Sequence, residues 1–234
     1  MSTEPGTAAP VRPELVVLDV NETLSDLAPL VQAFDDVGLS AHDTEAWFAG
    51  VLRDAFALTV LGDNPRFAEV ADSALRARLA AAGSPDPAGG AAHVMARFAA
   101  LGTHPDVVPG LLALARRGCR LVALSNGSAD VARALLRDTP AERVVEDCLA
   151  VTDTEAWKPD ARAYAHALST TGVAAEHAML VAVHPWDVEG ARRAGLRTAW
   201  INRTGAAYPA HFAPADVEAA SLLDLADALV VPSR

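Results

Sequence analysis

The segment ELVVLDVNETL, residues 14–24, opens with a short run of bulky apolar residues and becomes polar at Asp19. A continuous apolar run of this length, rich in β-branched residues, predicts a strand covered on both faces in a parallel sheet. Similar runs follow at 119–125, 143–151, 178–183 and 197–202. Helical patterns lie between most of these runs, at 108–117, 129–138, 160–171 and 188–194. This alternation predicts βαβ units and therefore an α/β fold with a doubly wound parallel sheet.

Residues 27–104 break this alternation. They show helical periodicity in four alanine- and leucine-rich segments, at 29–37, 43–61, 65–82 and 90–101. Turn-forming clusters, GDNP at 62–65 and GSPDPAGG at 83–90, separate the later segments. We therefore expect a helical cap domain over 27–104, inserted into an α/β core made of 14–26 and 105–234. Residues 1–13, rich in proline, threonine and alanine, predict a disordered lead-in.

Composition narrows the class of protein. The chain has 234 residues, 51% of them hydrophobic, which is enough to fill a sizeable core. Its 30 acidic residues exceed its 19 lysines and arginines and give a formal net charge of -11. This charge argues against a nucleic-acid partner and against binding to an anionic membrane. A locally positive pocket can still take a small anionic substrate.

The two cysteines, Cys119 and Cys148, are too few for a disulfide framework and do not have the spacing of zinc ligands. We interpret both as buried free thiols, since apolar residues surround each of them. The sequence starts without a basic segment followed by an apolar run, and no window approaches the ~20 apolar residues of a membrane span. We therefore expect a cytoplasmic protein with no signal peptide.

Polar side chains follow the predicted strands at the points where the strands end. The set comprises Asp19 after the first strand, Ser125 and Asn126 after the second, Lys158 before the helix at 160–171, and His184 and Asp187 after the strand at 178–183. Each has an ordinary explanation as a helix cap, a turn residue or a solvated lysine. Because the carboxyl ends of parallel strands face one crevice, we expect these side chains together at one edge of the sheet.

Four motifs in this order resemble those of the haloacid dehalogenase (HAD) superfamily of hydrolases. They are DVNETL (19–24), LSNGS (124–128), KPDARAY (158–164) and WDVEGARRAGLRTAWINRTG (186–205). The last three are similar to the L-2-haloacid dehalogenase (type II) branch in particular. The resemblance implies a Rossmann-like HAD core, no cofactor, a homodimer and a small anionic substrate. It implies hydrolysis of a carbon–halogen or related bond in a short 2-substituted carboxylic acid, through an ester on an aspartate nucleophile.

The resemblance also implies roles for individual residues. Asp19 matches the nucleophile, and Thr23 matches the residue that orients it. Lys158 would hold Asp19 ionised, since a nearby positive charge favours the charged form of a carboxyl group. Asp187 matches the carboxylate that helps to activate the hydrolytic water as a general base.

A second set of residues would surround the substrate. Ser125 and Asn126 match the residues that hold the substrate carboxylate, and Tyr164 matches a tyrosine that lines the site. Phe48, on a predicted cap helix, stands where the type II branch has an arginine that contacts the substrate. His184 stands where that branch has an asparagine.

The chain thus departs from the type II pattern at positions that affect its chemistry. Phe48 removes a guanidinium, and Arg53 lies on a different side of the same predicted helix. Ala182 and His184 replace a serine and an asparagine near the attacking water, although an imidazole can supply a donor or a base. Asn21 stands where the branch usually has an aromatic residue. An apolar roof at Phe48 would suit a larger or less polar substituent than that of a short halo acid.

Two other functions stay open. A magnesium-dependent HAD phosphatase acting on a small phosphate ester would draw part of its metal shell from Asp19, Asn21 and Asp187. Against it, the Asn21 amide cannot exchange a proton as the second aspartate of such phosphatases does. The other alternative is a catalytically weakened HAD scaffold with a binding role, motivated by the replaced side chains in the cap and after the fourth strand.

Overall fold

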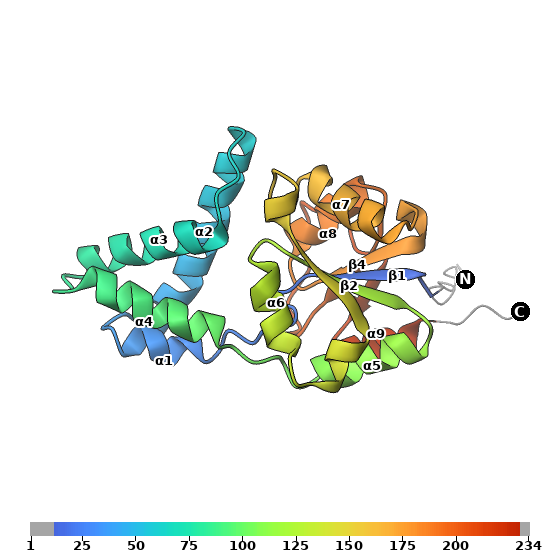
Figure 1. Ribbon diagram of the computed structural model, residues 1–234, viewed down its shortest axis with the longest axis horizontal. Helices are drawn as coiled ribbons and strands as arrows, with labels where there is room; N and C mark the ends of the chain where they lie inside the picture. The colour runs from blue at the N-terminus through green and yellow to red at the C-terminus, as the bar shows by residue number, and fades with distance from the viewer. Residues whose placement is uncertain (1–11, 230–234) are drawn as a thin grey trace, which may run out of the picture.

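The computed structural model describes residues 12–229, which contain one parallel sheet in the order β3-β2-β1-β4-β5-β6 (Figure 1). The strands are β1 (Leu15–Leu18), β2 (Arg120–Ser125), β3 (Val145–Ala150), β4 (Ala178–Ala182), β5 (Arg197–Ile201) and β6 (Val217–Ala219). β1 lies at the centre, where Leu15 is paired with Arg120 of β2 and Ala178 of β4. The predicted doubly wound parallel sheet is confirmed. Its winding reverses between β1 and β4, and ligands bind beside such a switch point.

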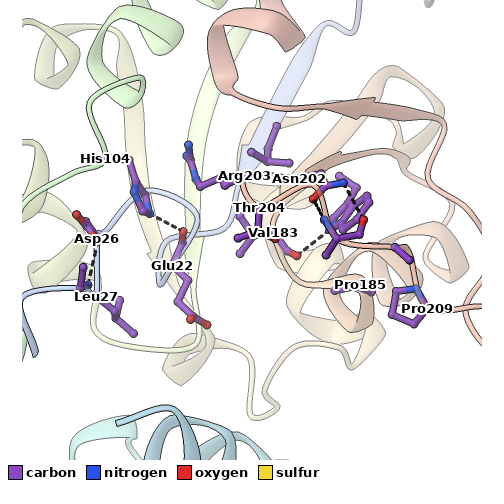
Figure 2. A pocket seen from close by; sticks show the side chains of 15 residues that line it. Glu22, Asp26, Leu27, His104, Val183, Pro185, Asn202, Arg203, Thr204 and Pro209 are labelled. Atoms are coloured by element: carbon purple, nitrogen blue, oxygen red, sulfur yellow. Dashed lines mark hydrogen bonds between the residues drawn. The ribbon is translucent and has the colours of Figure 1, made fainter. Parts of the chain in front are cut away.

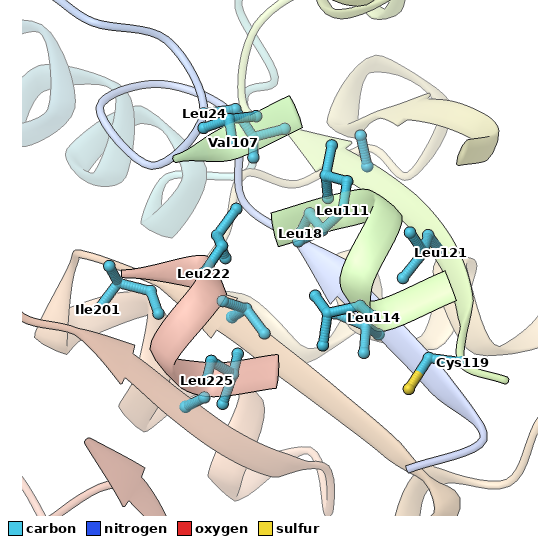
Figure 3. Close-up of a cluster of buried hydrophobic side chains, with 14 of the residues drawn as sticks. Leu18, Leu24, Val107, Leu111, Leu114, Cys119, Leu121, Ile201, Leu222 and Leu225 are labelled. Carbon is cyan, nitrogen blue, oxygen red and sulfur yellow. The ribbon is translucent and has the colours of Figure 1, made fainter. Parts of the chain in front are cut away.

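Alternate residues of β1 face opposite sides of the sheet, as strand geometry requires. Leu15 and Val17 pack into one apolar cluster, and Val16 and Leu18 pack into another. Figure 3 shows the second cluster, with Leu18 beside Leu111 and Leu114. Helices α7 (Ala161–Thr171) and α8 (Pro185–Arg193) cover the first face, and helices α5 (Val107–Arg116), α6 (Ala129–Leu136) and α9 (Leu222–Ala228) cover the second. Because both faces of β1 are covered, all four of its residues are fully buried.

The sequence patterns did not predict β6 or α9. β6 has three residues, which is too short to show a strand period, and it pairs only with β5. Three short 3-10 helices connect other elements, at Pro140–Arg143, Val151–Asp153 and Ala175–His177. Both cysteines are buried and free, as predicted. Of the predicted lead-in, residues 1–11 lie outside the described residues. Within 12–229, no helix combines the length and the apolarity needed to cross a bilayer.

Four helices occupy the chain between β1 and α5 and lie to one side of the sheet (Figure 1). They are α1 (Leu30–Asp35), α2 (Ala41–Val60), α3 (Phe67–Ala81) and α4 (Pro87–Ala99). Ser40 begins α2 with a reciprocal pair of hydrogen bonds to Asp43. Aromatic rings fill the centre of the bundle, where Trp47 meets Phe98 edge-on with 5.9 Å between ring centroids.

The helical bundle also packs against the α/β part of the chain. Its apolar cluster includes Val151 and Trp157, which follow β3. The indole of Trp157 donates to the carbonyl oxygen of Pro65 over 2.9 Å and stacks on Phe67 with 6.1 Å between ring centroids. Phe48 of α2 stacks on His184, which follows β4, at 6.4 Å. The bundle therefore covers the carboxyl edge of the sheet.

Candidate active site

The structure brings Asp19, Lys158 and Asp187 into direct contact at the carboxyl edge of the sheet. Asp19 follows β1, Lys158 precedes α7, and Asp187 lies in the first turn of α8. Nζ of Lys158 donates to Oδ1 of Asp19 over 2.7 Å and to Oδ2 of Asp187 over 2.6 Å. One buried ammonium therefore joins two carboxylates that are far apart in the sequence.

Lys158 is fully buried, and burial alone would lower its pKa. The charges of Asp187 and Asp19 outweigh that effect and raise the pKa of Lys158 above its ordinary value. The ammonium therefore stays charged. Asn126 holds the lysine backbone in place, because its Oδ1 accepts from the Lys158 N–H over 2.8 Å and its Nδ2 donates to the Lys158 carbonyl over 3.2 Å.

Asp19 is held as a carboxylate. Burial would raise its pKa, but the positive charge of Lys158 and the hydrogen bond and charge of His184 bring that pKa well below its ordinary value. Oδ2 of Asp19 accepts from Oγ1 of Thr23 over 2.6 Å and lies 3.0 Å from Nδ1 of His184. Oγ1 of Thr23 in turn accepts from the N–H of Val183 over 3.0 Å, which fixes the threonine to the end of β4.

Asp187 has a different environment from Asp19. Burial raises its pKa, and the nearby charge of Asp19 adds to the rise, although Lys158 acts in the opposite direction. Oη of Tyr164 donates to Oδ1 of Asp187 over 2.6 Å and is fully buried with it. Tyr164 therefore positions Asp187 and presents no hydroxyl to an open groove. A carboxylate with a raised pKa is better suited to accept a proton than Asp19 is.

Gly190 is a site residue that sequence reasoning missed. It lies on α8, one turn after Asp187, and a Cβ atom placed there would come within 2.5 Å of Oη of Tyr164 and within 2.5 Å of Cβ of Pro159. The absence of a side chain lets α7 and α8 approach closely enough for Tyr164 to reach Asp187. The signal was present as the glycine of the WDVEG motif, but a motif glycine alone does not reveal which atom approaches it.

A groove of about 700 Å³ leads between the helical bundle and the carboxyl edge of the sheet. Its lining includes Asn21 and Ser125 from the α/β part, and Arg66, Phe67 and Phe98 from the bundle. Oγ of Ser125 accepts from the N–H of Gly127 over 2.8 Å, which leaves the hydroxyl hydrogen available to a ligand. The groove therefore reaches residues that follow β1 and end β2, the two strands whose carboxyl ends carry Asp19 and Ser125.

Arg66 at the start of α3 is a second residue that the sequence did not single out. It is exposed in the groove that also contains Ser125. Its backbone N–H bonds to Glu69, and its guanidinium has no ion-pair partner within residues 12–229. Arg53, by contrast, pairs with Asp54 at 2.8 Å and its side chain is 77% exposed. Arg53 therefore faces solvent and cannot replace the guanidinium missing at Phe48.

His184 links Asp19 to Glu22, a third residue that the sequence did not single out. Nε2 of His184 lies 2.8 Å from Oε2 of Glu22, and the ring stacks on Phe48. Burial would lower the pKa of His184, but hydrogen bonds to Asp19 and Glu22 and their charges raise it to about 9. Glu22 has φ 62°, the left-handed region that non-glycine residues rarely adopt. Nothing in a sequence pattern predicts that conformation.

The carboxylates that the phosphatase alternative would use to hold magnesium are already engaged. Every carboxylate oxygen of Asp19 and Asp187 already has a hydrogen-bond partner, and the buried Lys158 ammonium lies between the two groups. A cation added there would have to displace the ammonium or sit beside it. Over the described range, no group of three or more histidine, cysteine, aspartate and glutamate side chains is arranged to hold a metal ion.

A carboxylate held ionised by a buried lysine at the switch point of a doubly wound sheet, beneath a layer of helices, is typical of hydrolases with an aspartate nucleophile. A family model described as haloacid dehalogenase-like hydrolase matches residues 13–195. The chain therefore belongs to the haloacid dehalogenase-like hydrolase family, and the resemblance stated from its motifs is confirmed.

Individual relatives agree with the type II branch. (S)-2-haloacid dehalogenase 4A of Burkholderia cepacia is 30% identical over 211 residues, which cover 89% of this chain and 91% of that protein. Haloacetate dehalogenase H-2 of Moraxella sp. (strain B) is 29% identical over 197 residues, covering 83% and 88%. A dehalogenase solved as an intermediate complex superposes with a TM-score of 0.86 at 29% identity, covering 94% of this chain and 98% of that one.

Proposed function

We propose that the protein hydrolyses the carbon–halogen bond of a short 2-halo carboxylic acid through an ester on Asp19. The observation that carries this proposal is the buried Asp19 carboxylate, which Lys158 holds ionised. An ionised carboxylate shielded from water is a competent nucleophile, and covalent catalysis divides one difficult displacement into two easier steps. The (S)-2-haloacid and haloacetate dehalogenases named above support this reaction and this class of substrate.

In the first step, an oxygen of Asp19 attacks the 2-carbon of the substrate and halide leaves, which forms an ester. In the second step, water attacks Cγ of Asp19, the bond between Cγ and the ester oxygen breaks, and a 2-hydroxy acid is released. Lys158 keeps Asp19 ionised for the first step, and Thr23 orients it. Asp187 bonds to the same ammonium, and the resemblance gives it the activation of water, although Lys158 and Tyr164 already occupy both of its oxygens.

The substrate carboxylate requires donors near Asp19. Ser125 lines the groove and has an available hydroxyl hydrogen, so it supports the role that the resemblance implies. The side chain of Asn126 is already bonded at both ends to the backbone of Lys158, and we assign it to positioning the lysine. Arg66 supplies the positive charge that a small anion needs at the mouth of the groove. The helical segment 27–104 would act as the cap over this groove.

Halide release from a panel of short 2-halo acids, without added metal, tests the proposal. We expect the wild-type protein to release halide and the Asp19→Ala variant to release none. The magnesium-dependent phosphatase would instead release phosphate from phosphate esters and lose that activity to a chelator. A binding protein on a weakened scaffold would turn over neither substrate. The cytoplasmic location and the homodimer stay predictions, and light scattering tests the latter.

A further inference from the structure

His184 and Glu22 form a series of hydrogen bonds that starts at Oδ2 of Asp19, the oxygen that Lys158 does not contact. Nδ1 of His184 lies 3.0 Å from Oδ2 of Asp19, and Nε2 lies 2.8 Å from Oε2 of Glu22. Exposure of the side chains rises along this series, from 5% for Asp19 to 12% for His184 and 41% for Glu22. This series of hydrogen bonds therefore connects a buried carboxylate to solvent.

Glu22 reaches a pocket that is separate from the groove at Ser125. The pocket has a volume of about 470 Å³, and its lining includes Glu22, Val183, Pro185 and Trp200 (Figure 2). Figure 2 shows the Glu22 side chain extending away from its backbone carbonyl, which bonds to His104 over 3.0 Å. Water in this pocket can exchange protons with the Glu22 carboxylate without passing through the groove.

The turn after β1 aims Glu22 at His184. Glu22 adopts φ 62° there, and its N–H donates to Oγ of Ser25 over 3.2 Å. Two aromatic rings pack against the imidazole. Phe48 of α2 lies 6.4 Å from it and Trp186 of α8 lies 5.0 Å from it, measured between ring centroids. An imidazole fixed between two carboxylates by two rings has one orientation, as a catalytic base requires.

We propose that His184 is the catalytic base that hydrolyses the Asp19 ester, and that Glu22 positions it and passes its proton to water in the 470 Å³ pocket. This inference rests on the proposed function, because it concerns the second step of that reaction. It also gives a role to the replacement at position 184, where an imidazole stands in place of the asparagine of the type II pattern.

The proton balance of the cycle follows from this assignment. In the free enzyme, His184 is an imidazolium that donates to the Asp19 and Glu22 carboxylates. When Asp19 becomes an ester and halide leaves, His184 loses one of its two charged partners and releases its proton through Glu22. Neutral His184 then takes a proton from the water that attacks Cγ. When the bond between Cγ and the ester oxygen breaks, the departing alkoxide takes the second proton of that water from the new carboxyl group, so Asp19 returns as a carboxylate and His184 is left as an imidazolium.

The groups that face His184 allow this change of protonation. Asp19 and Glu22 are the carboxylates in contact with it, and the rings of Phe48 and Trp186 carry no charge. The pKa of about 9 in the free enzyme depends on both carboxylates. Loss of the Asp19 charge on ester formation removes one of the two causes of that raised pKa, which favours the neutral base when the ester is present.

A single-turnover experiment with (S)-2-chloropropionate tests the proposal by following chloride, the solution proton concentration and the mass of the protein. In the wild type, we expect the proton to appear with chloride, before the ester is hydrolysed. The His184→Asn variant, which restores the type II residue, should release one chloride per protein and retain the ester, with hydrolysis slowed by about 100-fold or more. Glu22→Gln should slow hydrolysis less and change its pH profile.

His93→Asn is a matched control, because His93 also pairs with a carboxylate, Asp36, but lies in the helical bundle and is exposed. It should leave both phases unchanged. Ester hydrolysis at the wild-type rate in His184→Asn, or in Glu22→Gln if the first variant does not fold, would overturn the proposal. Absence of any chloride release by the wild type would instead refute the proposed function and this inference with it.

Discussion

The Lys158 ammonium lies 2.7 Å from Oδ1 of Asp19, and neither side chain is more than 5% exposed. The same nitrogen lies 2.6 Å from Asp187, so one cation balances two buried carboxylates. Two carboxylates this close cannot both stay ionised without it. The geometry of the site and the stability of the fold therefore depend on the same contact.

Replacing Lys158 with methionine should destabilise the protein strongly. Removing one partner of a buried ion pair leaves an uncompensated charge, which costs roughly 3–5 kcal/mol in the free energy of unfolding. Urea unfolding measures this change. Arg76→Met is the control, since Arg76 pairs with Asp72 on the surface of α3 and should cost about 1 kcal/mol or less. Equal losses in the two variants would contradict the account.

The pH dependence of stability should report His184. Its pKa is raised on folding from 6.5 to about 9, so its contribution is complete below pH 6.5 and is lost as the pH rises toward 9. The loss should be on the order of 3 kcal/mol, since each pKa unit corresponds to about 1.4 kcal/mol. His184→Asn should lack this part of the pH dependence. Parallel curves for wild type and variant, from denaturant unfolding at several pH values, would rule out the charged imidazole.

Gly190→Ala should separate α7 from α8. The added Cβ meets Tyr164 and Pro159 at 2.5 Å, and such overpacking costs about 1–3 kcal/mol. Displacement of Tyr164 should also reduce turnover, because Asp187 loses its hydroxyl donor. Gly50→Ala is the matched control, since Gly50 lies inside α2 with no atom within 4 Å of an added Cβ. That control should be stabilised by about 0.5–1 kcal/mol, and a similar gain for Gly190→Ala would contradict the contact.

Arg66→Ala should weaken the binding of an anionic substrate. Arg66 lines the groove beside Ser125, so its loss should raise KM by about tenfold, a value that corresponds to about 1.4 kcal/mol. The effect should diminish at high ionic strength, because the residue is exposed. Arg53→Ala is the control, since Arg53 faces solvent and pairs with Asp54. Steady-state kinetics on a short 2-halo acid measure KM for both variants, and an equal change of KM in the two would contradict a role for Arg66 in substrate binding.

Phe48→Arg should change which substrates the protein prefers. Phe48 contacts His184 from the helical bundle, so an arginine there adds a positive charge beside the imidazole and removes an apolar surface. We expect a shift toward shorter and more polar 2-halo acids, measured as kcat/KM across substrates of increasing size. An unchanged order of preference would show that Phe48 does not set it.

The motifs predicted which residues meet at the carboxyl edge of the sheet, because the apolar period fixes where each strand ends. The contact between Lys158 and Asp187 follows from that topology and from the resemblance. The roles of Gly190, Arg66 and Glu22 did not follow. Gly190 matters because it has no side chain, which lets α7 and α8 approach each other. Arg66 lies across the groove from Ser125, in the helical bundle. Glu22 depends on a left-handed backbone conformation that its residue type disfavours.

The sequence also predicted the helices between β1 and α5, but not how they dock. Docking depends on pairs such as Trp157 and Pro65, which are far apart in the chain and carry no local signal. The same limit applies to Arg53 and Phe48. Helical geometry placed them on different sides of α2, and the structure was needed to show that Arg53 faces solvent.

A single turnover in heavy-oxygen water, followed by mass analysis of the peptide containing Asp19, tests the central claim most directly. If an ester forms on Asp19 and water attacks its Cγ, the returning carboxylate carries the label and the product of that first turnover does not. Label found in the product, with none in the Asp19 peptide, would show that water attacks the substrate directly and would contradict the account.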